Sequence, residues 1–386
     1  MRKICVFTGT RAEYGILSNL MRLIQNDRDL QLQIMATNMH LSPEFGLTYR
    51  EIENDGFVID KKVEMLLSSD TAVGTLKSMG LATIGFADAL AELKPDLAVI
   101  LGDRYEMLVA AQACLISQIP VAHLYGGEIT EGAYDDAIRH AITKLSHLHF
   151  TSTEEHRRRV IQMGEQPGRV FNVGALGVDN ILKEPIMPLH ELEEYLSFKL
   201  GEKYLLVTFH PVTMEPGAAA EQCNALLNSL AALPDEYKVL FTLPNSDTDG
   251  RNIAKQIQDF AKSNPDRYLA VTSLGKYRYF SALKHTAAVV GNSSSGLVEA
   301  PMVHVPTLNI GNRQKGRCRG ASVIDCEAAE AEIKAGLQRV LSPEMQKIAR
   351  EAKNPYYQPN TLQSIFRILK STHLKNLTTK KFHDIK

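Results

Sequence analysis

Leu97-Ala98-Val99-Ile100-Leu101, at residues 97–101, is the stretch that decides the fold. It is a continuous apolar run preceded by Pro95, and this pattern predicts a parallel strand that is covered on both faces. Gly102-Asp103-Arg104 follows the run directly. Ligands of doubly wound α/β sheets bind outside the carboxyl ends of the strands. We therefore expect Asp103 and Arg104 at the mouth of a binding site.

A second strand, predicted at residues 119–124, brings Gly126-Gly127-Glu128 to the same edge. Tyr134-Asp135-Asp136 then begins a helix that continues through Arg139 and His140. Any one of these residues alone is better explained as a helix cap or a surface charge. Several carboxylates and cations close together in the chain favour a site with acid and base groups.

Composition limits the class of protein. With 386 residues, 44% of them apolar, the chain is long enough for two domains with separate cores. A formal net charge of −1 argues against nucleic acid or an anionic membrane as the main partner, because both bind strongly basic surfaces.

The chain begins with Met1-Arg2-Lys3 and a short predicted strand, without an apolar segment that would suggest a signal peptide or a membrane span. Its five cysteines, at 5, 114, 223, 318 and 326, include no CxxC pair. We therefore expect a reduced, cytoplasmic protein without a structural metal.

The first strand, predicted at residues 4–7, ends in a glycine turn that carries Arg11 and precedes an amphipathic helix. Free N–H groups and a guanidinium can share a phosphate at such a turn. The spacing matches neither the dinucleotide fingerprint nor the P-loop, so NAD is not indicated and no cofactor is expected. A strand at 32–37 leads to His40 at the same edge, and we expect loop and helix over residues 60–80.

The pattern breaks at residues 183–188, which contain two prolines, and a second series of strands and helices begins at residue 204. Its strands, predicted at 204–209, 238–242, 268–272 and 287–290, lead to His210, Asn245, Gly275 and the turn Gly291-Asn292-Ser293-Ser294-Ser295-Gly296. Glycines and serines that open a helix can bind a diphosphate, and Glu299 could accept a hydrogen bond from ribose.

The segment 311–319 adds four cations, including Arg313 and Arg317, and Phe280 is a candidate for stacking on a base. We accordingly predict an N-terminal Rossmann-like domain at 1–180 with the acid and base residues, and a C-terminal Rossmann-like domain at 181–360 that binds the nucleotide. A C-terminal helix and tail, residues 361–386, could pack back on the N-terminal domain.

Seven motifs now allow a comparison with a known family: Thr8-Gly9-Thr10-Arg11-Ala12-Glu13, Gly102-Asp103-Arg104, Gly126-Gly127-Glu128, Asp135-Asp136-Ala137-Ile138-Arg139-His140, Phe209-His210-Pro211-Val212-Thr213, residues 291–296 and Arg313-Gln314-Lys315-Gly316-Arg317. In order and type they resemble the hydrolysing UDP-N-acetylglucosamine 2-epimerases of sialic acid synthesis. The resemblance covers residues 1 to about 370. It implies a GT-B fold, with two Rossmann-like domains facing across a cleft, and a homodimer or homotetramer.

The resemblance also implies the reaction. UDP-N-acetylglucosamine and water give N-acetylmannosamine and UDP, through elimination to 2-acetamidoglucal and rehydration. It assigns acid and base work to Asp103, Glu128 and Asp135. It also assigns a catalytic role to His210, which would contact the diphosphate or assist its departure. It assigns nucleotide binding to Arg11, Arg104, Asn245, Ser293, Ser294, Glu299 and Arg313, with Phe280 under the uracil. His40, Arg139, Ser295 and Arg317 are further candidates for binding the substrate or nucleotide.

Two positions depart from relatives. Tyr125 stands where relatives often carry a catalytic Glu, so either Glu128 replaces that residue or Tyr125 and His123 share the proton transfer. Met39-His40-Leu41 replaces the Gln-His-Arg of non-hydrolysing epimerases, which favours the hydrolysing branch.

Alternatives remain open from the sequence. A hydrolysing epimerase of UDP- or GDP-linked N,N'-diacetylbacillosamine, from legionaminic acid synthesis, would carry similar motifs. A GT-B glycosyltransferase would need an acceptor and leave C2 unchanged. A non-catalytic UDP-sugar-binding protein would have no use for Asp103, Glu128 and Asp135.

Overall fold

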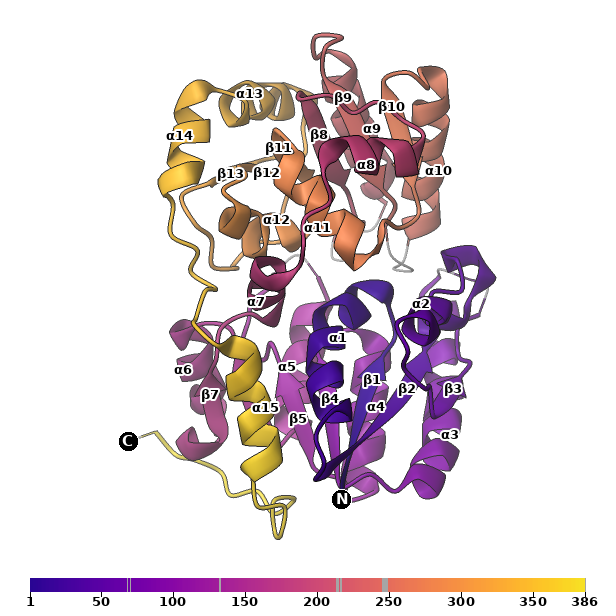
Figure 1. The fold of residues 1–386 in the computed structure, drawn as a ribbon, viewed down its shortest axis with the longest axis vertical. Coiled ribbons are helices and arrows are strands. Elements are labelled where there is room, and N and C mark those ends of the chain that lie inside the picture. The colour runs from indigo at the N-terminus through magenta and orange to yellow at the C-terminus, as the bar shows by residue number, and fades with distance from the viewer. Residues whose placement is uncertain are drawn as a thin grey trace. The chain divides into compact units, whose positions relative to one another are not determined.

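The computed structural model describes residues 1–67, 69, 71–131, 133–212, 215, 217–244 and 249–385. Contacts within the chain divide it into two compact units, and most of their helices and strands are labelled in Figure 1. The first unit comprises Met1–Glu128, Asp135–Asn180 and Tyr356–Lys386, and the second comprises Ile129–Tyr134 and Ile181–Pro355. Each unit is built on one parallel sheet. The predicted α/β class with two sheets is confirmed.

A seven-stranded sheet forms the centre of the first unit, in the order β3-β2-β1-β4-β5-β6-β7. All neighbouring strands in it are parallel, so their carboxyl ends lie along one edge. The strands are β1 (Arg2–Thr8), β2 (Leu30–Thr37), β3 (Lys61–Val63), β4 (Leu97–Leu101), β5 (Val121–Leu124), β6 (Leu148–Thr151) and β7 (Val170–Asn172).

Residues 60–80 differ from the expectation of loop and helix. The helix is present as α3 (Ala72–Leu93), but Lys61–Val63 forms the edge strand β3 beside β2. An edge strand of three residues is too short to show the alternation by which strands are recognised in a sequence.

Helices cover both faces of this sheet. Successive side chains of a strand point to opposite faces, so Ile4 and Val6 join one buried cluster while Cys5 and Phe7 join another. This explains why the strands are continuously apolar in sequence. The helices of this unit are α1 (Arg11–Gln25), α2 (Tyr49–Asn54), α3, α4 (Tyr105–Ile116), α5 (Asp135–Leu145), α6 (Glu154–Gln162), α15 (Thr361–Ser371) and α7 (Leu176–Lys183), which continues into the second unit.

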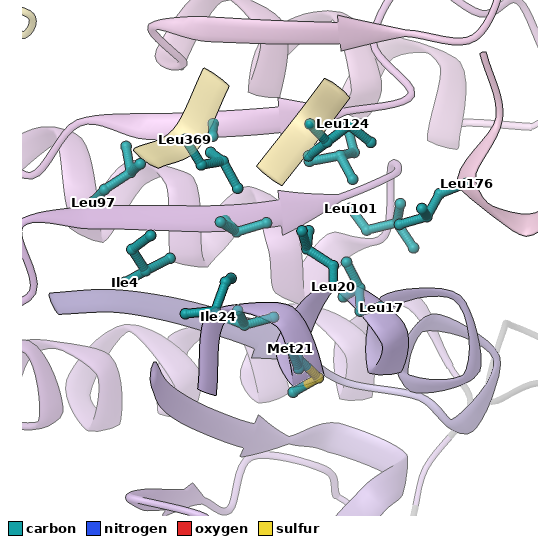
Figure 2. Close-up of a cluster of buried hydrophobic side chains, with 14 of the residues drawn as sticks. Ile4, Leu17, Leu20, Met21, Ile24, Leu97, Leu101, Leu124, Leu176 and Leu369 are labelled. Atoms are coloured by element: carbon teal, nitrogen blue, oxygen red, sulfur yellow. The ribbon is translucent and has the colours of Figure 1, made fainter. Parts of the chain in front are cut away.

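One buried cluster holds α1 and the C-terminal helix α15 on the same sheet face (Figure 2). The apolar side of α1 and Leu369 of α15 meet side chains from three neighbouring strands, β1, β4 and β5. Those drawn with labels are Ile4, Leu17, Leu20, Met21, Ile24, Leu97, Leu101, Leu124, Leu176 and Leu369. The end of the chain is therefore part of the core of the first unit.

The second unit has a six-stranded parallel sheet in the order β10-β9-β8-β11-β12-β13. Its strands are β8 (Tyr204–Thr208), β9 (Lys238–Thr242), β10 (Tyr268–Val271), β11 (Ala288–Gly291), β12 (Thr307–Ile310) and β13 (Val323–Cys326). Its helices are α8 (Leu189–Leu196), α9 (Ala219–Ala231), α10 (Gly250–Ser263), α11 (Gly275–His285), α12 (Ser295–Val298), α13 (Glu330–Val340) and α14 (Pro343–Glu351). Across both units, none of the described helices combines the length and apolar character needed to cross a membrane.

Gly291, at the end of β11, provides a test of the second sheet. Its φ is +128°, and a Cβ there would lie 2.0 Å from the Thr208 carbonyl oxygen on β8. We expect Gly291→Ala to lower the free energy of unfolding by about 2–4 kcal/mol, because neither backbone can give way without breaking the ladder. Urea denaturation measures the change.

Gly80→Ala is the matched control. Gly80 lies inside α3 with no atom near its would-be Cβ, so this change should stabilise the protein by about 0.5–1 kcal/mol. Equal effects of the two substitutions would contradict the close approach of β8 and β11.

Candidate functional site

A fully buried arginine lies at the centre of the acidic cluster in the first unit. Arg139 of α5 donates from one terminal nitrogen to Asp103 Oδ2, and from the other to the Glu128 carbonyl oxygen at 2.9 Å and to Asp136 Oδ1 at 3.2 Å. The Arg139 side chain is 0% exposed, whereas that of Asp103 is 21% exposed. Arg139 thus holds the loops after β4 and β5 against α5, and Asp103 retains a solvent-accessible part.

Glu128 is buried at 2% exposure, with its carboxylate in a chain of hydrogen bonds. Ser152 Oγ donates to Glu128 Oε1 at 2.7 Å, and His156 Nδ1 lies 3.0 Å from the same hydroxyl. Sequence reasoning missed Ser152 and His156, although Ser152 follows β6 as Asp103 follows β4. Asp135 is the first residue of α5 and is half-buried.

His123 and Tyr125 have structural contacts. His123 is fully buried, and its Nε2 lies 2.7 Å from the Gly102 carbonyl oxygen while its Nδ1 lies 3.2 Å from Thr143 Oγ1. Burial lowers the pKa of His123 to about 3, so the ring is neutral and donates to Gly102. The Tyr125 hydroxyl accepts from the Gly177 amide at 3.0 Å. These contacts favour Glu128 over a Tyr125 and His123 pair in proton transfer.

Arg11 and His40 are both engaged within the first unit. Arg11 Nε donates to the two Glu51 carboxylate oxygens, at 2.8 and 2.6 Å. The ring nitrogens of His40 lie 2.9 Å from Thr8 Oγ1 and 2.8 Å from Thr48 Oγ1. Burial and the nearby Arg11 charge lower the pKa of His40 to about 3. A buried, neutral His40 with both nitrogens paired is placed to support the loop after β2 rather than to bind an anion.

Arg104 lies beside Asp103 and is itself 8% exposed. Its Nε donates to Glu106 Oε1 at 2.8 Å. Glu106 is completely buried and was not among the predicted site residues. The first unit thus contains a second arginine and carboxylate pair next to the Arg139 cluster.

In the second unit, Asn292 fixes His210. The side-chain oxygen of Asn292 accepts from the His210 backbone N–H at 2.7 Å, and its amide nitrogen donates to the His210 carbonyl oxygen at 2.8 Å. Asn292 is fully buried and His210 is 7% exposed. Asn292 follows β11 and His210 follows β8. The two hydrogen bonds of the Asn292 side chain therefore join two neighbouring strand ends.

Arg313 reaches the same turn from the loop after β12. Arg313 donates to the Asn292 carbonyl oxygen at 3.2 Å, and Gln314 donates to the same oxygen at 2.8 Å. Arg317 instead lies 3.3 Å from Thr130 Oγ1, and Arg319 pairs with Asp325 of β13. Arg313 thus contacts the serine turn directly.

The serine turn itself is short. Ser293, Ser294 and Ser295 are half-buried, and the helix that they open, α12, has four residues. The aligned dipoles of a long helix are therefore missing, and binding of a phosphate would depend on the hydroxyls and on Arg313.

Three other predicted ligands have different placements. Phe280 is 5% exposed and belongs to a core cluster with Leu206 and Leu283, which does not favour stacking under a uracil. Glu299 is 7% exposed and follows α12. Asn245 lies outside the described residues. Within the described ranges, no three His, Cys, Asp or Glu side chains are grouped so that they could hold a metal ion.

Known proteins with related sequences and folds bear on this site. The model of the family described as UDP-N-acetylglucosamine 2-epimerase matches residues 22–370. A hydrolysing GDP/UDP-N,N'-diacetylbacillosamine 2-epimerase of Campylobacter jejuni is 46% identical over 326 residues, covering 84% of this chain and 84% of that protein. The polysialic acid biosynthesis protein P7 of Escherichia coli is 38% identical over 387 residues, covering 100% of this chain and 98% of that protein.

Among solved structures, the UDP-GlcNAc 2-epimerase of Methanocaldococcus jannaschii, in complex with UDP-GlcNAc and UDP, has a TM-score of 0.79 to this chain. The similarity covers 96% of this chain and 100% of that one, at 19% sequence identity, and it shows a shared GT-B-like fold. The family match extends over most of the chain and includes both units. The chain therefore belongs to the UDP-N-acetylglucosamine 2-epimerase family.

Proposed function

We propose that this protein is a hydrolysing 2-epimerase of a nucleotide-linked 2-acetamido sugar. The observation that supports it most strongly is the Arg139 cluster, in which one buried cation holds Asp103 and the Glu128 loop at the ends of adjacent strands. Removal of a weakly acidic C2 proton and its replacement need positioned acid and base groups. Carboxylates held in fixed orientations supply them.

The proposed reaction has two stages. A carboxylate takes the proton from C2, the bond between C1 and the diphosphate oxygen breaks, and the nucleoside diphosphate leaves as 2-acetamidoglucal forms. Water then adds its oxygen to C1 and gives up one proton to a carboxylate, while an acid protonates C2 on the opposite face. We assign these proton transfers to Asp103, Glu128 and Asp135, with Arg139 as a positioning residue.

Groups of the second unit are proposed to bind the nucleotide. His210, Ser293, Ser294 and Arg313 offer donors to a diphosphate, since all four lie on loops after β8, β11 and β12. Charge-assisted hydrogen bonds from an arginine are among the stronger contacts to a phosphate. Glu299 remains a prediction for the ribose and Asn245 for the nucleotide, and a homodimer or homotetramer remains a prediction for the assembly.

Two candidates for the sugar of the substrate have support. The 46% identity to a diacetylbacillosamine epimerase favours a GDP- or UDP-linked diacetamido sugar. The 38% identity to a polysialic acid biosynthesis protein supports UDP-N-acetylglucosamine as the second candidate, with N-acetylmannosamine as product in sialic acid synthesis. We place the diacetamido sugar first.

Product analysis tests this proposal. The purified protein is incubated separately with UDP-N-acetylglucosamine and with UDP- and GDP-linked N,N'-diacetylbacillosamine, and products are identified by NMR. We expect nucleoside diphosphate and a free sugar inverted at C2, with the highest kcat/KM for a diacetamido substrate.

Each other outcome points to a different protein class. A nucleotide-linked epimer as the end product would indicate a non-hydrolysing epimerase. Transfer of the sugar to an added acceptor would indicate a glycosyltransferase. Intact substrate that is bound tightly would indicate a sugar-nucleotide-binding protein.

Asp103→Asn tests the acid and base assignment. The variant keeps an oxygen that can accept from Arg139 but loses the charge, so we expect kcat to fall by about 10²–10⁴-fold while UDP affinity stays within about threefold. Steady-state kinetics and calorimetry measure the two quantities, with a melting curve to confirm folding. Near-normal turnover in the folded variant would remove Asp103 from the mechanism.

Arg313→Ala tests nucleotide binding. We expect UDP binding to weaken by roughly 1–3 kcal/mol through loss of a charge-assisted contact. Gln314 still donates to the Asn292 carbonyl oxygen, so the turn keeps one of its bonds. Arg319→Ala is the control, because Arg319 pairs with Asp325 and should leave UDP affinity nearly unchanged. The reverse order of effects in calorimetry would show that the diphosphate site is misplaced.

A further inference from the structure

Two buried glutamates lie close together in the first unit, and the proposed reaction does not use either of them. Glu13 of α1 is 7% exposed, and Glu106 of α4 is 0% exposed. Both belong to the first turns of helices that begin after adjacent strands, β1 and β4. They therefore lie beside the loop that carries Asp103 and Arg104.

Both carboxyl groups contact Gly9. Glu13 Oε2 accepts from the Gly9 N–H at 2.7 Å and from the Thr10 N–H at 3.0 Å, which completes a capping box with the Thr10 hydroxyl. Glu106 Oε1 lies 2.5 Å from where a Cβ on Gly9 would stand. Gly9 thus lies next to both side chains, and a larger residue there would displace Glu106.

Each glutamate has one buried oxygen without a partner. Within the part of the chain that the structure describes, Glu13 Oε1 and Glu106 Oε2 are shielded from solvent and make no hydrogen bond. Two ionised carboxylates with unpaired oxygens would be very costly in this environment. A single proton between the two groups removes one charge and gives a donor to one of the orphaned oxygens.

The surrounding charges indicate which group carries the proton. Arg104 Nε donates to Glu106 Oε1 at 2.8 Å, so Glu106 has a cation as its direct partner. Glu13 has backbone amides as its direct partners, and burial, followed by the Glu106 charge, raises the pKa of Glu13 to about 8. His40, whose backbone N–H donates to the Gly9 carbonyl oxygen, is neutral, and Arg11 is paired with Glu51.

We propose that Glu13 and Glu106 share one proton at neutral pH, carried by Glu13 Oε1 and donated toward Glu106 Oε2, and that this pair positions Arg104 and the turn at Gly9 and Thr10. Glu13 and Glu106 are thus positioning residues, because they act through the loop that also carries Asp103. The catalytic part of this inference rests on the proposed function, whereas the shared proton does not.

Glutamine substitutions distinguish the two positions. A glutamine resembles a protonated glutamate, so Glu13→Gln keeps an acceptor for Gly9 and a donor toward Glu106. We expect this variant to fold, to melt at or above the wild-type temperature at neutral pH, and to keep kcat within about threefold. Glu106→Gln removes the charge that pairs with Arg104, and it should lower the melting temperature by at least a few degrees.

The pH dependence of stability gives a second measurement. Glu13 binds its proton up to about pH 8 when folded but only up to about pH 4.5 when unfolded, so the stability from this group is present at low pH and is lost as pH rises between these values. Glutamine has no titratable proton, so Glu13→Gln keeps this stability as pH rises. The melting temperature of Glu13→Gln minus that of wild type should therefore rise from about pH 5 to about pH 8. Glu92→Gln, an exposed partner of Lys61, should show no such rise.

Infrared spectroscopy and kinetics complete the test. Wild type at neutral pH should show the C=O band of a protonated, buried carboxyl group, and Glu13→Gln should lack it. Three results would each overturn the shared proton. They are a melting-temperature difference between Glu13→Gln and wild type that does not change with pH, the absence of the infrared band in wild type, and an equal loss of stability in Glu13→Gln and Glu106→Gln. If the shared proton is found but the kcat of Glu106→Gln equals that of wild type, the positioning role is wrong. If wild type has no epimerase activity, the melting and infrared results still decide on the pair.

Discussion

The buried guanidinium of Arg139 is the interaction on which the proposed site depends. A cation without solvent contact must keep its hydrogen-bonded partners, because an uncompensated buried charge costs several kcal/mol. Arg139 meets this requirement with Asp103, Asp136 and the Glu128 carbonyl oxygen. The same bonds fix the loops after β4 and β5, so the stability of the first unit and the arrangement of its acids have one cause.

The same principle operates at other strand ends. Asn292 holds the His210 backbone in both directions, and His123 anchors the Gly102 carbonyl oxygen just before Asp103. In each case a buried polar side chain from one strand end satisfies backbone groups of the neighbouring one. Asp103 and the serines at 293–295 are less buried than these supporting side chains, whereas Glu128 and His210 are almost fully buried. Rigid support thus lies beneath Asp103 and the serine turn, which remain partly accessible.

Much of the fold could be predicted because parallel strands buried on both faces leave long apolar runs, such as residues 97–101. The strand ends could be located for the same reason, and with them Asp103, Glu128 and His210. Partners that meet only in three dimensions could not be found. Ser152 is an ordinary residue in sequence, and its contact with Glu128 depends on packing. Glu106 is only two positions from Arg104, but its complete burial likewise follows from packing. The edge strand β3 and the buried position of Phe280 also follow from tertiary structure.

Reaction in D2O measures the central claim, that carboxylates exchange the hydrogen at C2, most directly. When the sugar nucleotide that serves as substrate is converted in D2O, we predict deuterium at C2 of the released sugar. NMR detects it as loss of the C2 proton signal. A released sugar that retains its original hydrogen at C2 would contradict the elimination, and with it the role given to the Arg139 cluster.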